Sequence, residues 1–354
     1  MPGRQMIARV TVPRSGVAAG DRARTLGVQT AFLGDVVLTI PLLDALAERF
    51  GPVDVLATPG AAPLIETHPA VRRVVRYDKK GADRGFRRFR QLVGALRTEA
   101  YARAYLPHRS WRSAALAMLA RIPVRIGFDD SPARVTYTEC RTRPTGVHES
   151  VRLLALLDPA PAPRPFHLAL TDQDRARATA WLTAAGVGTP FVALAPGSIW
   201  GTKRWPYYAE LARNLDIAVV AVGGPDDAAL GETIAAAAPG RAVNAAGVLS
   251  LRESAALIER AAVLVTNDSA PLHLAPGVGT PVVAIFGPTV PAFGFGPLGA
   301  DDVVVEHHAM PCRPCSPHGP QVCPLGHHRC MKELGPGTVA REVHRILSLP
   351  GARR

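Results

Sequence analysis

The sequence predicts an α/β protein of two doubly wound domains that face each other across a central cleft. Short β-branched runs alternate with helical patterns in both halves of the chain, as in parallel sheets covered on both faces. A stiff Pro-rich stretch at residues 158–165 separates the halves. The length of 354 residues also suits two domains of roughly 100–200 residues each.

The first domain is expected over residues 25–160. It opens with a predicted strand at 25–30 and an apolar-periodic helix from about Val36 to Arg49. Further β-branched or apolar runs predict strands at 53–57, 71–77 and 101–106. The Arg- and Phe-rich segment 84–90 fits either the start of a solvated amphipathic helix or a surface that stacks on bases.

The second domain is expected over residues 171–333, after a linker at 161–170, with a C-terminal helix within 334–354. Buried strands are predicted at 191–195, 217–222, 263–266 and 282–286, and helices near 207–214, 226–238 and 251–260. Because ligands of such sheets bind beyond the carboxyl ends of the strands, the residues that follow these strands are the functional candidates.

Composition and motifs exclude several classes of protein. Hydrophobic residues make up 47% and charged residues 20%, which excludes wholesale disorder. The apolar stretches around 36–47 and 114–124 are interrupted by Asp44 and Arg121, and they fall short of the ~18–20 residues of a membrane span. No P-loop or G-x-S-x-G pattern is present, which disfavours P-loop kinases and α/β-hydrolases. The G-x-G-x-x-G run at 294–299 and the D-x-D run at 172–174 do not directly follow a predicted strand, which disfavours a conventional dehydrogenase and a metal-ligating D-x-D site.

The N-terminal stretch and the overall charge bear on location and partners. Residues 1–24 carry five arginines and no apolar core, so either a mobile extension or a start codon placed too far upstream is expected there, rather than a secretory signal. The 41 basic against 29 acidic residues give a net charge of +12, which favours anionic partners such as nucleotides or lipid head groups. No zinc-finger, RNA-recognition or helix-turn-helix signature points to nucleic acid.

Four of the five cysteines gather near the C-terminus. Cys312, Cys315, Cys323 and Cys330 lie within 19 residues, and nearby histidines add possible ligands. In a reducing compartment such a cluster is more often metal-binding than disulfide-bonded. The spacing C-x2-C-x7-C-x6-C is not a standard zinc pattern, so both a structural zinc and a loop of packed thiols stay open.

The first segment that could carry chemistry follows the strand at 25–30. Gly34 and Asp35 lie where a strand-to-helix loop brings backbone N–H groups and one carboxylate to the cleft. Asp35 fits either a helix N-cap or a general base that takes a proton from a sugar hydroxyl.

The second segment, 195–206, follows the strand at 191–195. Ser198 and Thr202 offer hydroxyls, and Lys203 and Arg204 offer positive charge to a phosphate. The alternative is a surface turn with a solvated Lys-Arg pair.

The third segment ends the strand at 263–266. Asn267, Asp268 and Ser269 precede a helix whose free N–H groups suit an anion, and His273 lies one turn further along. Asp268 also fits a plain N-cap. Shortly after, the tight loop with Gly287 and Thr289 follows another strand and is placed to close over a diphosphate.

In this order the segments resemble glycosyltransferase family 9, the ADP-heptose:lipopolysaccharide heptosyltransferases. The resemblance rests on residues 30–41, 196–206, 266–281 and 286–289, and the tail 312–331 is similar to the heptosyltransferase II branch. It implies a GT-B fold of two Rossmann-like domains, with the acceptor on the N-terminal one and ADP-heptose on the C-terminal one. It also implies an inverting transfer that needs no metal or other cofactor.

Carried onto this sequence, the resemblance makes Asp35 the general base and has Lys203 neutralise the leaving diphosphate. Asn267, Asp268, Ser269 and His273 would hold the diphosphate and heptose, and Asp226 would accept hydrogen bonds from the adenosine ribose. The chain departs from the family pattern at Gly27, inside a strand, at Ala270, where Gly is frequent, and in the 24 residues before the first strand.

The implied acceptor is Kdo-lipid A that already carries inner-core heptose, so transfer of the second heptose is expected. The implied location is the cytoplasmic face of the inner membrane, where part of the positive charge would attract anionic lipid. One rival reading keeps the fold with another nucleotide sugar or acceptor. A second, a zinc-stapled nucleic-acid-binding protein, leaves the three cleft segments unexplained.

Overall fold

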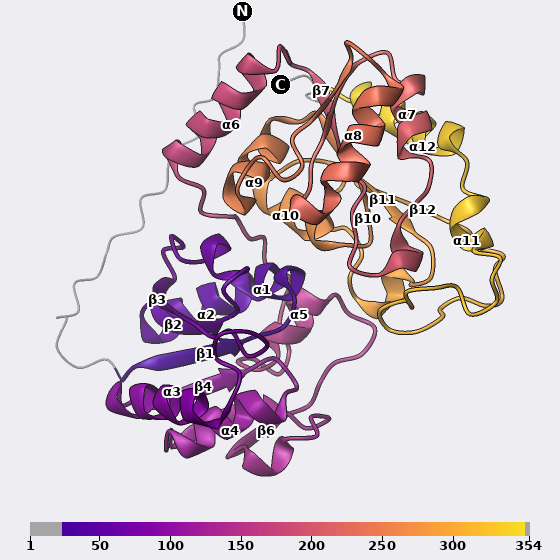
Figure 1. Cartoon of the computed structure of the whole chain (residues 1–354). Coiled ribbons are helices and arrows are strands. Elements are labelled where there is room, and N and C mark those ends of the chain that lie inside the picture. The colour runs from indigo at the N-terminus through magenta and orange to yellow at the C-terminus, as the bar shows by residue number, and fades with distance from the viewer. Residues whose placement is uncertain (1–22, 351–354) are drawn as a thin grey trace, which may run out of the picture.

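Two parallel sheets organise the structure (Figure 1), a computed structural model that describes residues 23–350. The first sheet has six strands in the order β3-β2-β1-β4-β5-β6, and the second has six in the order β12-β11-β10-β7-β8-β9. Counted from its first strand, each sheet has the same doubly wound order, with a crossover point beside β1 and beside β7. The predicted α/β fold of two doubly wound halves is confirmed.

The strands of the first sheet pack mainly through branched and small apolar side chains. They are β1 (Thr25–Gln29), β2 (Val53–Ala57), β3 (Val71–Arg76), β4 (Arg103–Leu106), β5 (Val124–Phe128) and β6 (Glu139–Arg141). The strand predicted at 53–57 is reproduced, and those at 25–30, 71–77 and 101–106 are one or two residues too long. β5 and β6 were not predicted, because Arg and Gly interrupt the apolar run of β5 and β6 has only three residues.

The helix predicted from Val36 to Arg49 is in fact two helices. They are α1 (Leu33–Leu38) and α2 (Ile40–Phe50), which meet at Thr39. Pro41 lies in the first turn of α2 and has no N–H to continue the α1 hydrogen bonds, so the helix is interrupted just before it. The other helices of this half are α3 (Phe86–Thr98), α4 (Trp111–Leu119) and α5 (Glu149–Leu154).

The second half repeats the design. Its strands are β7 (Phe191–Ala195), β8 (Ala218–Ala221), β9 (Ala242–Asn244), β10 (Val263–Asn267), β11 (Val282–Phe286) and β12 (Val303–Glu306). Its helices are α6 (Asp172–Ala184), α7 (Tyr208–Asn214), α8 (Ala228–Ala237), α9 (Leu251–Arg260), α10 (Ala270–Val278), α11 (Arg329–Lys332) and α12 (Pro336–Leu347). The helix predicted at 226–238 begins instead with the 3-10 turn Pro225–Asp227, which leads into α8.

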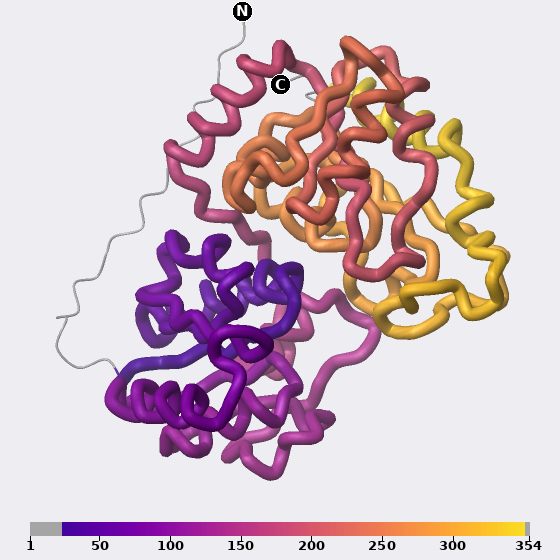
Figure 2. Tube along the Cα trace, in the orientation of Figure 1, coloured from indigo at the N-terminus to yellow at the C-terminus, as the bar shows by residue number. Residues whose placement is uncertain are grey.

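Between α5 and α6 the described chain contains neither helix nor strand, and the Pro-rich linker was predicted there. Figure 2 follows the chain through this stretch from the indigo and magenta half into the orange and yellow half. The exact domain limits stay a prediction. The expected extension at 1–24 falls almost entirely on residues outside the described range, as does the end of the 334–354 segment.

The two halves touch at several points that fix the cleft. Arg252 of α9 donates to Pro63 O at 2.8 Å and to Thr67 Oγ1 at 2.6 Å, both in the first half. Two other nitrogens of Arg252 donate to Asp174 Oδ2 at 3.0 and 2.6 Å. The buried guanidinium therefore has a carboxylate partner in its own half as well as hydrogen bonds to the first half. Helices α1 and α10 also pack against each other across the boundary.

Candidate active site

A cavity of about 680 Å³ lies between the carboxyl ends of the two sheets. The start of α1 forms its wall on the first half, and the segments after β7, β8, β9, β10 and β11 form its wall on the second half. Nine of the predicted site residues line it: Gly34, Asp35, Ser198, Lys203, Arg204, Asp226, Asp268, Ser269 and His273. The other four lie behind this wall: Thr202, Asn267, Gly287 and Thr289.

Asp35 brings a carboxyl group to the cavity from the first turn of α1. Its Oδ2 accepts the backbone N–H of Phe32 at 3.1 Å, so the side chain also satisfies one free donor of the helix start. Burial, and next the negative charge of Glu149, raise its pKa from 3.8 to about 6 against the lowering effects of the Phe32 N–H and of Arg143. A carboxylate with this pKa is suited to accept a proton near neutral pH.

Gly34 lets α1 approach α10 closely. A Cβ at this position would lie 2.6 Å from Cδ2 of His273, so a larger residue requires a shift of the His273 ring or of one helix. Burial is the largest effect on the pKa of His273 and lowers it to about 4, so the imidazole is neutral at pH 7. Gly34, which was predicted to lie in a loop that brings backbone N–H groups to the cleft, thus also allows the two halves to approach closely.

A buried ion pair lines the wall that the second half contributes. Lys203 Nζ donates to Asp268 Oδ2 at 2.6 Å, and Thr289 Oγ1 donates to the same oxygen at 2.6 Å. The Lys203 and Asp268 side chains are 10% and 9% exposed, and both line the cavity. The Lys-Arg segment is therefore not a solvated surface turn, since one of its two cations is buried and paired.

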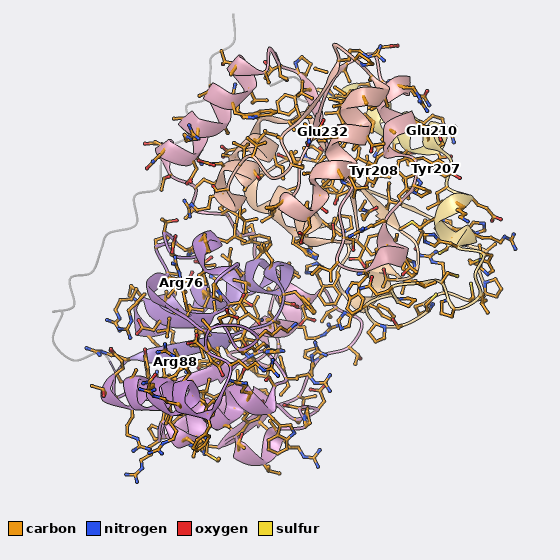
Figure 3. The ribbon with its side chains drawn as sticks, viewed as in Figure 1. Arg76, Arg88, Tyr207, Tyr208, Glu210 and Glu232 are labelled. Atoms are coloured by element: carbon orange, nitrogen blue, oxygen red, sulfur yellow. The ribbon has the colours of Figure 1, made fainter. Side chains whose placement is uncertain are left out.

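Asn267 has a different place from the one expected. Its Oδ1 accepts the Trp205 N–H at 3.1 Å and the Tyr208 hydroxyl at 3.2 Å, and its Nδ2 donates to Pro196 O at 2.8 Å. The side chain lies under the cavity wall and ties β10 to the segment after β7. Tyr208, labelled in Figure 3, begins α7 in the second half.

Two more predicted contacts also lie behind the wall. Thr202 Oγ1 donates to Pro320 O at 2.5 Å, which holds the 3-10 turn Gly201–Lys203 against the Cys-rich loop. At Gly287, a Cβ would lie 2.7 Å from the Met331 side chain, so this glycine allows close packing rather than access to a ligand.

The carboxylate next to Asp226 was missed. Asp226 is exposed at the cavity, whereas Asp227 lies deeper and accepts the Gly224 N–H at 3.1 Å. A Cβ on Gly197 or Gly223 would lie within 2.2–2.7 Å of the Asp227 side chain. Burial raises the pKa of Asp227. The signal was the glycine that follows each of the strands β7 and β8, because both make room for this carboxylate.

The Cys-rich loop covers part of the cavity. The His318 ring stacks on the Trp200 ring, with the two ring centroids 5.9 Å apart. The Phe32 ring, which belongs to the first half, packs edge-on against the same His318 ring, with the centroids 6.0 Å apart. His318 and Pro317 line the cavity. Sequence reasoning had assigned this loop no contact with the site.

The four clustered cysteines are free thiols. Burial, with the neighbouring thiols, raises the pKa of Cys330 to about 11, and Cys315 Sγ donates to Cys312 O at 3.4 Å. Within residues 23–350 no three His, Cys, Asp or Glu side chains come together to hold a metal ion. Cys330 is buried, and Cys312, Cys315 and Cys323 are half-buried.

Among the helices of the described chain, none combines the length and apolar character needed to cross a bilayer.

Comparison with known proteins agrees with this geometry. The chain is 26% identical to lipopolysaccharide heptosyltransferase 2 of Salmonella typhimurium, over 93% of this chain and 99% of that protein. Its fold is similar to E. coli ADP-heptose lps heptosyltransferase II (TM-score 0.75, 24% identity, 92% of this chain and 98% of that one). It is also similar to a family 9 glycosyl transferase from Veillonella parvula (TM-score 0.82, 21% identity, 94% and 99%). The family model described as glycosyltransferase family 9 (heptosyltransferase) matches residues 89–322, and the chain belongs to that family.

Proposed function

We propose that this glycosyltransferase moves heptose from ADP-heptose to the inner core of lipopolysaccharide, and that it adds the second heptose. The names of its relatives, lipopolysaccharide and lipooligosaccharide heptosyltransferase 2, support the donor and the acceptor class. One observation carries the proposal for this chain. Asp35 on one wall of the cavity faces the buried Lys203–Asp268 pair on the other, so a base and a cation lie on opposite sides of the space for the sugar.

Asp35 is the proposed general base. The acceptor hydroxyl gives its proton to the carboxylate while its oxygen forms a bond to the anomeric carbon of heptose. The bond from that carbon to the diphosphate oxygen breaks, and ADP leaves with the electron pair. Because base and leaving group lie on opposite walls, the attack comes from the face opposite the diphosphate and inverts the anomeric configuration.

The second half carries the groups proposed to stabilise the leaving diphosphate. Lys203 supplies positive charge, and the start of α10 at Ser269 and Ala270 turns backbone N–H groups toward the cavity. The sugar diphosphate shares Lys203 with Asp268, and Thr289 stays bonded to that carboxylate. We propose that these groups do the work of a metal ion, so that transfer proceeds without an added divalent cation.

The adenosine is proposed to bind where the segments after β8 and β9 meet. Leu249, Leu251 and Ile258 give that part of the cavity an apolar wall suited to a base. Asp226 and Asp227 border it and can accept hydrogen bonds from ribose hydroxyls.

The start of α3 is the proposed contact with the anionic face of the inner membrane, on its cytoplasmic side. Phe86 is 74% exposed, and in the described chain neither Arg87 nor Arg88 forms an ion pair with a carboxylate. Figure 3 shows Arg88 on the same side of the first half as Arg76. A basic residue near an anionic surface contributes about 1 kcal/mol, so Arg87→Ser should weaken binding to anionic vesicles about fivefold.

The vesicle test uses co-sedimentation with anionic and neutral bilayers. Arg341→Ser, which removes an exposed arginine of α12 in the other half, is the matched control and should bind as the unmodified protein does. Equal recovery of the unmodified protein with both kinds of vesicle would remove the membrane contact from the proposal.

The function is tested by ADP release from ADP-heptose, with and without Kdo-lipid A that already carries one heptose. Release that depends on this acceptor is the expected result. Tight ADP binding without release would keep the donor and redirect the search to other acceptors. Failure to bind ADP would refute the donor assignment and favour another nucleotide sugar.

A further inference from the structure

A further contact between the two halves lies beside Asp35. The loop that follows β11 reaches the start of α5 in the first half, where the Glu149 N–H donates to Gly294 O at 2.8 Å. His148 Nε2 bonds Gly296 O at 3.1 Å, and its Nδ1 accepts the Ser150 N–H at 3.2 Å, which leaves the ring hydrogen on Nε2. Two backbone carbonyls of the second half, Gly294 O and Gly296 O, are thus hydrogen-bonded to the start of α5 in the first half.

Buried charges stabilise the same contact. The Glu149 carboxylate accepts bonds of 3.1 Å at each oxygen from Arg143 and a further bond from Arg152. Arg152 donates in turn to Phe293 O at 3.4 Å and to Val147 O at 3.1 Å. Glu149 and Arg152 are only 5% and 7% exposed, so each needs the other to offset the loss of hydration.

Gly294 makes this approach possible. Its φ is +100°, a conformation that glycine adopts without strain. A Cβ there would lie 2.8 Å from Val147 O and 3.2 Å from the Glu149 nitrogen. The loop therefore docks only while position 294 has no side chain.

The contact connects directly with the cavity. Phe293 and Phe295, on either side of Gly294, both line it, and the Phe295 ring packs edge-on against His273 at 6.1 Å. On the first half, α5 packs against α1, the helix that carries Asp35. The start of α5 thus contacts segments that belong to both walls.

We infer that Glu149 is a positioning residue for Asp35, and that the docked loop of the other half holds it in place. The loop after β11 completes the cavity wall and also fixes the Glu149–Arg152 pair. Closure of the two halves therefore also sets the charge environment of the base, Asp35. The catalytic meaning of this role rests on the proposed function, in which Asp35 accepts the proton of the acceptor.

The charges around Asp35 give the direction of the effect. The negative charge of Glu149 raises the pKa of Asp35, and Arg143 lowers it. His273, which faces α1 from α10, is neutral at pH 7. Without the Glu149 charge, the Arg143 charge would act on Asp35 uncompensated, so the pKa of Asp35 should fall.

The charged side chain of α2 that is nearest to Asp35 along the chain is Asp44. Its Oδ1 lies 3.8 Å from Nδ1 of His68. Across the cavity the Lys203 and Asp268 charges offset each other in their ion pair. Neither pair changes when Glu149 is replaced.

The test follows the Asp35 carboxyl itself by carbon-13 NMR titration, with its signal identified by its loss in Asp35→Asn. Glu149→Gln keeps the size of the side chain and should lower the titration midpoint of Asp35 by about one pH unit. Gly294→Ala should undock the loop and also lower the midpoint, with a larger radius of gyration in solution scattering. Glu139→Gln, which removes a partly exposed charge paired with Arg141, is the control and should leave the midpoint unchanged.

The pH dependence of kcat/KM is the second readout. In Glu149→Gln its acid limb should move to lower pH by the same amount, with little change in the KM for ADP-heptose. An unchanged midpoint in folded Glu149→Gln would overturn the positioning role, whatever the activity. A shifted midpoint in a protein that transfers no heptose would instead refute the proposed function and leave the electrostatic role intact.

Discussion

Replacement of Asp35 by Asn should make the protein more stable at neutral pH. In the folded chain the pKa of this carboxyl is about 6, against 3.8 as its ordinary value. Below about pH 3 the group is largely protonated whether the chain is folded or unfolded, so it has little effect on the free energy of unfolding. As the pH rises from about 3 to 7 the unfolded chain ionises first, so the free energy of unfolding falls until the group is charged in both forms.

At 1.36 kcal/mol for each pH unit, this difference corresponds to a destabilisation of about 3 kcal/mol above pH 7. Asn keeps an oxygen for the Phe32 N–H but cannot ionise, so Asp35→Asn should recover most of that free energy at pH 8 and almost none at pH 3. Urea unfolding at the two pH values measures the difference. Asp216→Asn, at an aspartate that is 97% exposed, is the control and should change stability equally little at both. If Asp35→Asn were no more stable than the unmodified protein at pH 8, the carboxyl would not be desolvated as described.

Three further substitutions separate close packing, loop support and ligand contact. Gly34→Ala should lower the free energy of unfolding by about 1–3 kcal/mol, because the added Cβ overlaps His273. The affinity for ADP should fall as well. Thermal unfolding measures the first effect and calorimetry the second. Asn267→Ala should also lower the unfolding temperature. It leaves the Trp205 N–H and the other buried partners of the Asn267 amide without a hydrogen bond, at a cost of about 1–3 kcal/mol each. An unchanged unfolding temperature would mean that the Asn267 amide does not hold the segment after β7. Asp227→Asn should weaken ADP binding while the fold stays intact, and calorimetry that gave unchanged affinity would remove this carboxylate from the nucleoside site.

Local patterns in the sequence were sufficient for the elements that carry their own signals. The strand β11 and the helix α9 were predicted with their observed bounds, because β-branched runs between turn residues and a 3.6-residue period are local properties. The break between α1 and α2 was missed although its cause, Pro41, is also local. The apolar residues keep their helical spacing across Pro41, so the pattern predicted one continuous helix.

The candidate site divides in the same way. Asp35, Lys203 and Asp268 could be predicted because each follows a strand, and parallel sheets bring such positions to one edge. His318 and Glu149 could not, because their relation to the cavity depends on how distant segments pack. His318 reaches Trp200 across more than a hundred residues, and Glu149 meets a loop that the sequence gives no reason to place beside it.

The misplacement of Asn267 has another physical cause. An amide at the end of a strand can bond a ligand or a neighbouring loop with the same donor and acceptor atoms. Only the fold decides between them, and here the four bonding positions face Trp205, Tyr208 and the backbone after β7.

The central claim is that Asp35 takes the acceptor proton while the second half holds the leaving ADP. The most direct test compares Asp35→Ala with the unmodified protein for heptosyl transfer and for ADP affinity. Turnover should fall by roughly 10²–10⁴-fold, the usual contribution of a positioned base, while the Kd for ADP changes little. Turnover close to normal would show that Asp35 serves only the start of α1 and would contradict the proposed mechanism.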